Sequence, residues 1–66
     1  MYREKLRRIR MGKGISQEHV ARKVGVGIPM VSMIENGLRS MQVPMFRIWC
    51  KALGVTYDEV LDEEEE

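Results

Sequence analysis

The sequence predicts an all-α fold, a compact bundle of five helices. Three observations lead to this prediction. Apolar residues recur at the spacing of three and four that fits one face of a helix, and no stretch alternates as a half-buried strand does. A glycine follows each of the first four predicted helices, where the left-handed conformation of a C-cap favours it. The connections between these segments are short.

The first three predicted helices are placed by their ends. The five helices are expected over residues 2–11, 16–24, 28–36, 43–53 and 56–61. Gly12 and Gly14 end the first. Ser16 is a favourable N-cap for the second, because its hydroxyl can accept from a free backbone N–H. Pro29 is tolerated in the third, since the first turn of a helix has no internal N–H bonds to lose.

The last two predicted helices carry an apolar stripe and a capping box. Residues at i, i+3, i+4 and i+7 form the stripe: Phe46, Trp49, Cys50 and Leu53. Cys50 is expected in the core, and Trp49 either in the core or half-exposed. In the sequence TYDE at 56–59, a Thr is followed three residues later by a Glu, so the two side chains can cap each other's backbone N–H.

Length and charge indicate one domain, residues 1–61, followed by an acidic tail, residues 62–66. Residues 1–51 hold all 11 Lys and Arg against three of the 10 acids, and residues 52–66 hold the other seven acids and no base. A basic body suits a polyanionic partner such as DNA, although ordinary surface charge gives the same balance. We expect the tail to be solvated; a second hypothesis is that it repels phosphates and weakens non-specific DNA binding.

Composition argues against several other classes of protein. With one Cys and one His, the sequence holds neither a disulfide nor a cysteine-based zinc site, and it shows no catalytic constellation or phosphate-binding glycine loop. We therefore expect no enzyme, metal or cofactor. No apolar run reaches the roughly 20 residues that span a bilayer, and the first residues are no secretion signal. The expected location is cytoplasmic.

Residues 15–37, ISQEHVARKVGVGIPMVSMIENG, have the layout of a helix-turn-helix. Ala21 is small enough for two crossing helices to approach closely. Gly25 permits the turn between them, because it adopts positive φ without a Cβ clash. Val31 and Ile34 form the inward pair of the following helix.

Here the chain resembles the Cro/CI-type (XRE-like) helix-turn-helix family, which includes phage repressors. The resemblance covers about residues 6–61 and is strongest in ISQEHVARKVGV, IENG and KALGVTYDEVL. It implies a lambda-repressor-like five-helix fold. It also implies a transcriptional regulator, such as a repressor, that binds double-stranded operator DNA as a homodimer on a palindrome.

The resemblance assigns backbone contacts to residues at helix ends and in a loop. These candidates are Arg10, Gln17, Asn36 and Arg39. Gln17 stands at the start of the second helix, where a phosphate is favourably bound. Arg10 and Glu35 match a pair that forms a partly buried salt bridge in many relatives. Such contacts supply affinity and register, but they carry no sequence information.

The positions that would face base edges depart from the family's pattern. They are Ile28, Pro29, Met30, Ser32 and Met33, in a recognition helix expected over 28–36. Relatives carry polar side chains at several of these positions, whereas here only Ser32 offers a hydroxyl. Apolar side chains can contact the thymine methyl, and DNA shape can add specificity.

Two other readings of this apolar cluster stay open. The cluster could bind a protein partner, which would make the chain a protein-interaction module on the same fold. Alternatively, Met30 and Met33 could pack into the small core. His19 is expected to be an exposed residue of the second helix.

Dimerisation is expected through the C-terminal part of the domain. The residues available there are Val55, Tyr57, Val60 and Leu61. Relatives dimerise around the fifth helix, and one unit of this size contacts few base pairs.

Overall fold

The computed structural model describes residues 2–62. Within that range the chain forms five helices and no strand, so the predicted all-α class is confirmed. The helices are α1 (Tyr2–Gly12), α2 (Gln17–Val24), α3 (Ile28–Glu35), α4 (Val43–Leu53) and α5 (Tyr57–Asp62). Residues 63–66, most of the predicted acidic tail, lie outside the described residues.

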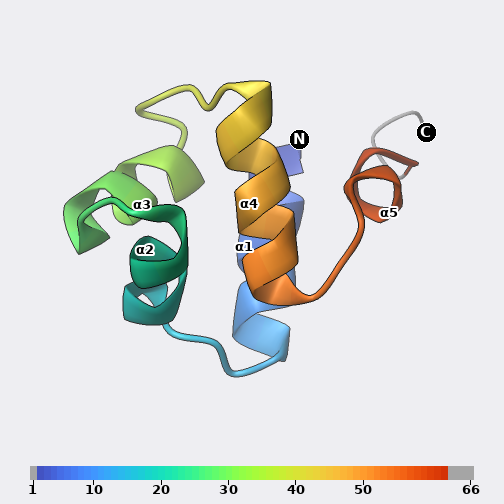
Figure 1. The fold of residues 1–66 in the computed structure, drawn as a ribbon, viewed down its shortest axis with the longest axis horizontal. Helices are drawn as coiled ribbons and strands as arrows, with labels where there is room; N and C mark the ends of the chain where they lie inside the picture. The colour runs from blue at the N-terminus through green and yellow to red at the C-terminus, as the bar shows by residue number, and fades with distance from the viewer. Residues whose placement is uncertain (1, 63–66) are drawn as a thin grey trace.

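Helix α4 stands at the centre of the molecule (Figure 1). The pair α2 and α3 lies on one side of α4, α5 lies on the other, and α1 lies behind it. Helix α2 packs against both α3 and α4, while α1 contacts α3, α4 and α5. The α2–α3 pair is therefore supported from one side and leaves its other side open.

Helix ends follow the predicted capping chemistry. The Ser16 hydroxyl accepts a hydrogen bond from the His19 N–H at 3.0 Å. At α5 the Thr56 N–H donates to the Glu59 carboxylate at 3.0 Å, and the Glu59 N–H donates to the Thr56 hydroxyl at 3.1 Å. Both expected caps are thus present. Helix α3 has no side-chain cap at Gly27 and ends at Glu35, one residue before the predicted end.

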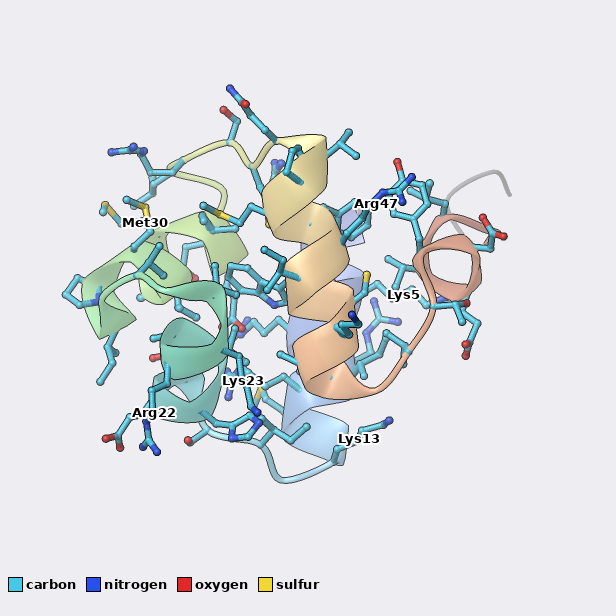
Figure 2. All side chains as sticks on the ribbon, viewed as in Figure 1. Lys5, Lys13, Arg22, Lys23, Met30 and Arg47 are labelled. Atoms are coloured by element: carbon cyan, nitrogen blue, oxygen red, sulfur yellow. The ribbon has the colours of Figure 1, made fainter. Side chains whose placement is uncertain are left out.

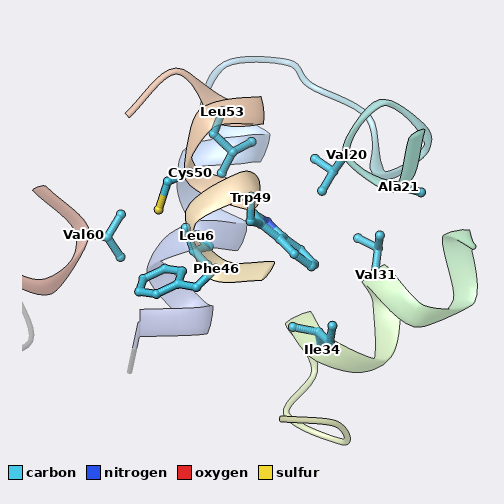
Figure 3. Close-up of a cluster of buried hydrophobic side chains, with 10 residues drawn as sticks. All are labelled: Leu6, Val20, Ala21, Val31, Ile34, Phe46, Trp49, Cys50, Leu53 and Val60. Atoms are coloured by element: carbon cyan, nitrogen blue, oxygen red, sulfur yellow. The ribbon is translucent and has the colours of Figure 1, made fainter. Parts of the chain in front are cut away.

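The core joins all five helices around Trp49 (Figure 3). Trp49 is 0% exposed, which decides between the two positions that the sequence left open for it. Its indole reaches toward the α2–α3 pair, and Val60 of α5 faces Phe46 and Cys50 on the other side. The buried apolar residues are Leu6, Val20, Ala21, Val31, Ile34, Phe46, Trp49, Cys50, Leu53 and Val60.

Candidate nucleic-acid interface

The α2–turn–α3 unit has the geometry that its sequence predicts. Gly25 adopts φ +88, in the left-handed region, and its N–H donates to the Ala21 carbonyl at 2.8 Å. Ala21, Val31 and Ile34 are buried between the helices and α4. With these side chains facing inward, the opposite side of α3 is left toward solvent.

The outward side of α3 carries most of the residues expected to read bases. Ile28 is 45% exposed, and Pro29 beside it is exposed. Ser32 and Met33 are half-buried. The hydroxyl of Ser32 accepts weakly from the Asn36 side-chain amide, at 3.4 Å. This surface of α3 is therefore mostly apolar, and the Ser32 hydroxyl is the one polar group among the residues expected to read bases.

The sequence left open whether Met30 faces solvent on α3 or packs into the core, and its position is intermediate between the two. It is half-buried and packs against the core, yet it stays on the α3 side of the molecule, away from Arg47 and α5 (Figure 2). A long unbranched thioether can fill such an irregular edge and still present part of its surface.

Gln17 and Asn36 stand at two helix ends that come together in space. Gln17 is the first residue of α2, and Asn36 is the C-cap of α3. The Gln17 amide nitrogen donates to Glu35 Oε1 at 3.2 Å, which ties the beginning of α2 to the end of α3. Arg39 is exposed in the loop that follows α3. Asn36 and Arg39 are thus exposed and Gln17 is half-buried, so three of the four residues expected at the DNA backbone keep accessible surface.

The fourth, Arg10, lies in the salt bridge with Glu35 that the resemblance implies. Its Nε lies 2.6 Å from Glu35 Oε2, and its Nη2 donates to Glu35 Oε1 at 3.1 Å. A third donor, Nη1, reaches the Ile15 carbonyl at 2.9 Å. The predicted salt bridge is confirmed. The guanidinium is engaged in this contact and its side chain is 11% exposed, so little of Arg10 is left at the surface. Its contact with a phosphate stays a prediction.

The helix-turn-helix family matches the chain over residues 6–60. This match spans the paired helices, the core and α5. The chain belongs to the Cro/CI-type helix-turn-helix DNA-binding family. No curated protein is similar enough to be matched with it.

In this helix-turn-helix protein α3 itself holds no Lys or Arg, so the positive charge near it comes from neighbouring elements. Arg22, Lys23 and Lys13 are spread along the lower edge of the view in Figure 2, and Lys5 and Arg47 lie toward α5. Two lysines also have structural contacts: Lys5 donates to the Glu59 carbonyl at 2.9 Å and Lys13 to the Leu53 carbonyl at 2.8 Å.

The expected dimer surface is only partly available. Val55, Tyr57 and Leu61 are half-buried, but Val60 is 0% exposed because it packs into the core. Val60 is therefore corrected from a surface residue to a core residue. The ring of Tyr57 lies 4.9 Å from that of Phe46.

The structure has a surface groove between α4 and α5 that the sequence did not predict. It is lined by Arg47, Ile48, Cys50, Lys51, Val55 and Tyr57. Ile48 is 43% exposed, and its place off the α4 apolar stripe was the available signal. The Arg47 guanidinium lies 5.4 Å from the centre of the Tyr57 ring.

No group of three potential metal-ligating side chains occurs among residues 2–61. Cys50 is 2% exposed. Burial is the larger cause that raises the pKa of its thiol, and the negative charge of Glu59 is the smaller one. A thiol with a raised pKa is a poor nucleophile. Within the described part of the chain, no helix is long and apolar enough to cross a bilayer.

Proposed function

We propose that this chain is a cytoplasmic, sequence-specific transcriptional regulator of Cro or repressor type that binds double-stranded DNA through α3. The observation that carries this proposal is the open side of the α2–α3 pair: Val31 and Ile34 hold α3 on the core, and Ile28 and Pro29 stand outward. A helix held in this way can enter the major groove while α2 crosses the backbone.

Contacts with the DNA backbone fall to Gln17, Asn36 and Arg39. Gln17 is the first residue of α2, where free backbone N–H groups and the helix dipole favour a phosphate. Asn36 is exposed at the other helix end, and Arg39 supplies a positive charge from the loop. Arg10 supports these contacts indirectly, because it pairs with the Glu35 carboxylate that accepts from Gln17.

Base reading falls to Ile28, Pro29, Ser32 and Met33, with the exposed part of Met30 at the edge. Apart from the Ser32 hydroxyl, these side chains have no donor or acceptor for a base edge. We infer that they contact thymine methyl groups, and that DNA shape and bendability supply much of the specificity.

A homodimer on a palindromic operator would double the number of bases contacted. Val55, Tyr57 and Leu61 are the predicted residues that keep surface for this purpose. Val55 and Tyr57 line the α4–α5 groove, where Ile48 adds exposed apolar area.

A protein-interaction module is the alternative. The observation in its favour is that Leu38 is 74% exposed and Ile28 is 45% exposed, an unusual surface for a partner as polar as a phosphate backbone. Exposed apolar patches mark protein-binding sites in many soluble proteins.

Duplex binding measured against salt concentration tests the proposal. We expect affinity to fall steeply as salt rises, because bound phosphates release counterions. Gln17→Ala should weaken binding by about 1–2 kcal/mol, roughly 5- to 30-fold, on every sequence while leaving the salt slope unchanged, since a neutral amide displaces no counterion. Arg39→Ala should lower the slope by about 1.

His19→Ala is the matched control on the same helix. His19 is exposed in the groove between α2 and α4, with Lys23 and Lys51, on a different side of α2 from Gln17. Its removal should leave duplex affinity unchanged. Absence of binding to any duplex at low salt would overturn the DNA proposal and favour the protein-partner alternative.

A further inference from the structure

The carboxylate of Glu35 is shared by two side chains with different exposure. Oε2 accepts from Arg10 Nε at 2.6 Å, and Oε1 accepts from Arg10 Nη2 at 3.1 Å. The same Oε1 also accepts from Gln17 Nε2 at 3.2 Å. Glu35 is only 5% exposed, whereas Gln17 is half-buried at the surface. Glu35 thus connects a buried cation to a surface amide.

This contact selects one of the two orientations of the Gln17 amide. A carboxylate only accepts hydrogen bonds, so the amide must turn its NH₂ group toward Glu35 and its oxygen away. One Nε2 hydrogen is then donated to Glu35, and the second remains available for another acceptor. A phosphate also only accepts, and it needs an amide that presents NH₂. The orientation held by Glu35 is the orientation that a phosphate requires.

The charge of Glu35 would by itself repel a phosphate. Arg10 removes this difficulty, because its guanidinium pairs with both carboxylate oxygens and makes the buried pair neutral overall. The fixed amide also loses less side-chain freedom when it binds, which favours a tighter complex.

We propose that Glu35 is a positioning residue for DNA binding, which holds the Gln17 amide with its NH₂ group ready for a backbone phosphate. This inference rests on the proposed function. It assigns to the Arg10–Glu35 pair a role at the interface in addition to joining α1 to α3. Glu35 itself touches no DNA in this arrangement.

A first measurement uses the free protein and needs no DNA. The side-chain NH₂ signals of Gln17 and Gln42 are compared by NMR hydrogen exchange. Gln42 is exposed and makes no capping hydrogen bond, so it serves as an internal control. One Gln17 hydrogen should exchange several-fold more slowly than those of Gln42. Equal exchange of the two glutamines would overturn the positioning role.

A double-mutant cycle then tests the link to DNA. The background is the paired variant Arg10→Met with Glu35→Met, because replacing both members of a buried ion pair by apolar residues leaves no unpaired charge. Gln17→Ala should cost roughly 5- to 30-fold in duplex affinity in the wild-type chain and less than about 2-fold in the paired background. An equal loss in both backgrounds would overturn the proposal.

Arg10→Lys is the control for a merely structural effect. It weakens the bidentate pair but keeps the Glu35 carboxylate beside Gln17, so Gln17→Ala should retain its full cost there. If the paired variant does not fold, hydrogen exchange of the Gln17 side chain in the wild-type protein still tests whether Glu35 holds the amide. Slow Gln17 exchange without binding to any duplex overturns the proposed function, whereas binding with a freely exchanging amide overturns only the role of Glu35.

Discussion

At the scale of single residues, Glu59 shows how a capping contact changes a titration. Its carboxylate accepts from the Thr56 N–H at 3.0 Å. This hydrogen bond is the main reason why the pKa of Glu59 lies below its ordinary value, and the Thr56 side chain and two lysines lower it further. An exposed carboxyl group thereby becomes a reporter of whether α5 is folded.

Acid should therefore loosen α5 through Glu59. Because the pKa is lower in the folded chain, the contribution to stability is complete above the ordinary value of 4.5 and is lost as pH falls through the folded value. NMR titration should show the lowered pKa in the wild-type chain and a smaller lowering in Thr56→Ala, which removes the side-chain hydrogen bond and keeps the backbone N–H. Glu59→Gln should lose less stability between neutral and acid pH than the wild type does; equal acid sensitivity would contradict this assignment.

At the scale of elements, the turn between α2 and α3 depends on one backbone conformation. Gly25 ends α2 with φ +88, and a Cβ placed there would meet no atom within 4 Å. The demand for glycine at this position is therefore conformational and not steric. The same turn fixes the angle at which α3 is presented.

Gly25→Ala should lower the free energy of unfolding by about 1–2 kcal/mol, the cost of the left-handed conformation for a residue with a Cβ. Thermal and urea unfolding followed by circular dichroism measure this change. Gly12→Ala is the matched control, since Gly12 also has open space within 4 Å but lies in α1 without positive φ. It should stabilise the chain by about 0.5–1 kcal/mol. Similar effects of the two substitutions would contradict the argument.

At the scale of the whole molecule, the Arg10–Glu35 pair connects distant parts of a small domain. It joins α1 to α3, and through Ile15 and Gln17 it also holds the connection into α2. A chain of 66 residues has a total stability on the order of 3–10 kcal/mol. The free energy contributed by one buried ion pair is therefore a large fraction of the total free energy of unfolding.

Arg10→Met should cost about 3–5 kcal/mol, because it leaves the Glu35 charge buried without its cation. Arg22→Met tests the same chemistry at the surface. Its partner Glu18 lies 3.3 Å away, but the two side chains are 75% and 65% exposed, so the loss should be about 0–0.5 kcal/mol. Urea unfolding of the two variants compares them directly. Small losses in both would show that the buried pair contributes little.

Much of the fold could be predicted because its signals are local. The bounds of α4, the Ser16 cap, the capping box at 56–59 and the turn at Gly25 each follow from a few neighbouring residues. The Arg10–Glu35 pair was predicted only through the family resemblance, since 25 positions separate its members along the chain.

The candidate site was harder to predict than the fold. A periodic pattern places a side chain on a face of its helix, but it does not say which neighbouring helix covers that face. Val60 was expected at a dimer surface and lies in the core, because α5 turns that side toward α1 and α4. Arg10 was expected both in a salt bridge with Glu35 and at a phosphate; the salt bridge is present, and the phosphate contact stays a prediction.

The sequence by itself determined the helices, their caps and the apolar character of the helix expected to read DNA, because helix propensity, capping and glycine turns act over a few residues. The tertiary structure alone decided which side chains remain accessible. It buried Trp49 and Val60, left Ile28 and Leu38 in solvent, and brought Gln17 to the carboxylate of Glu35. Those outcomes depend on how five helices share one small core, which no local pattern contains.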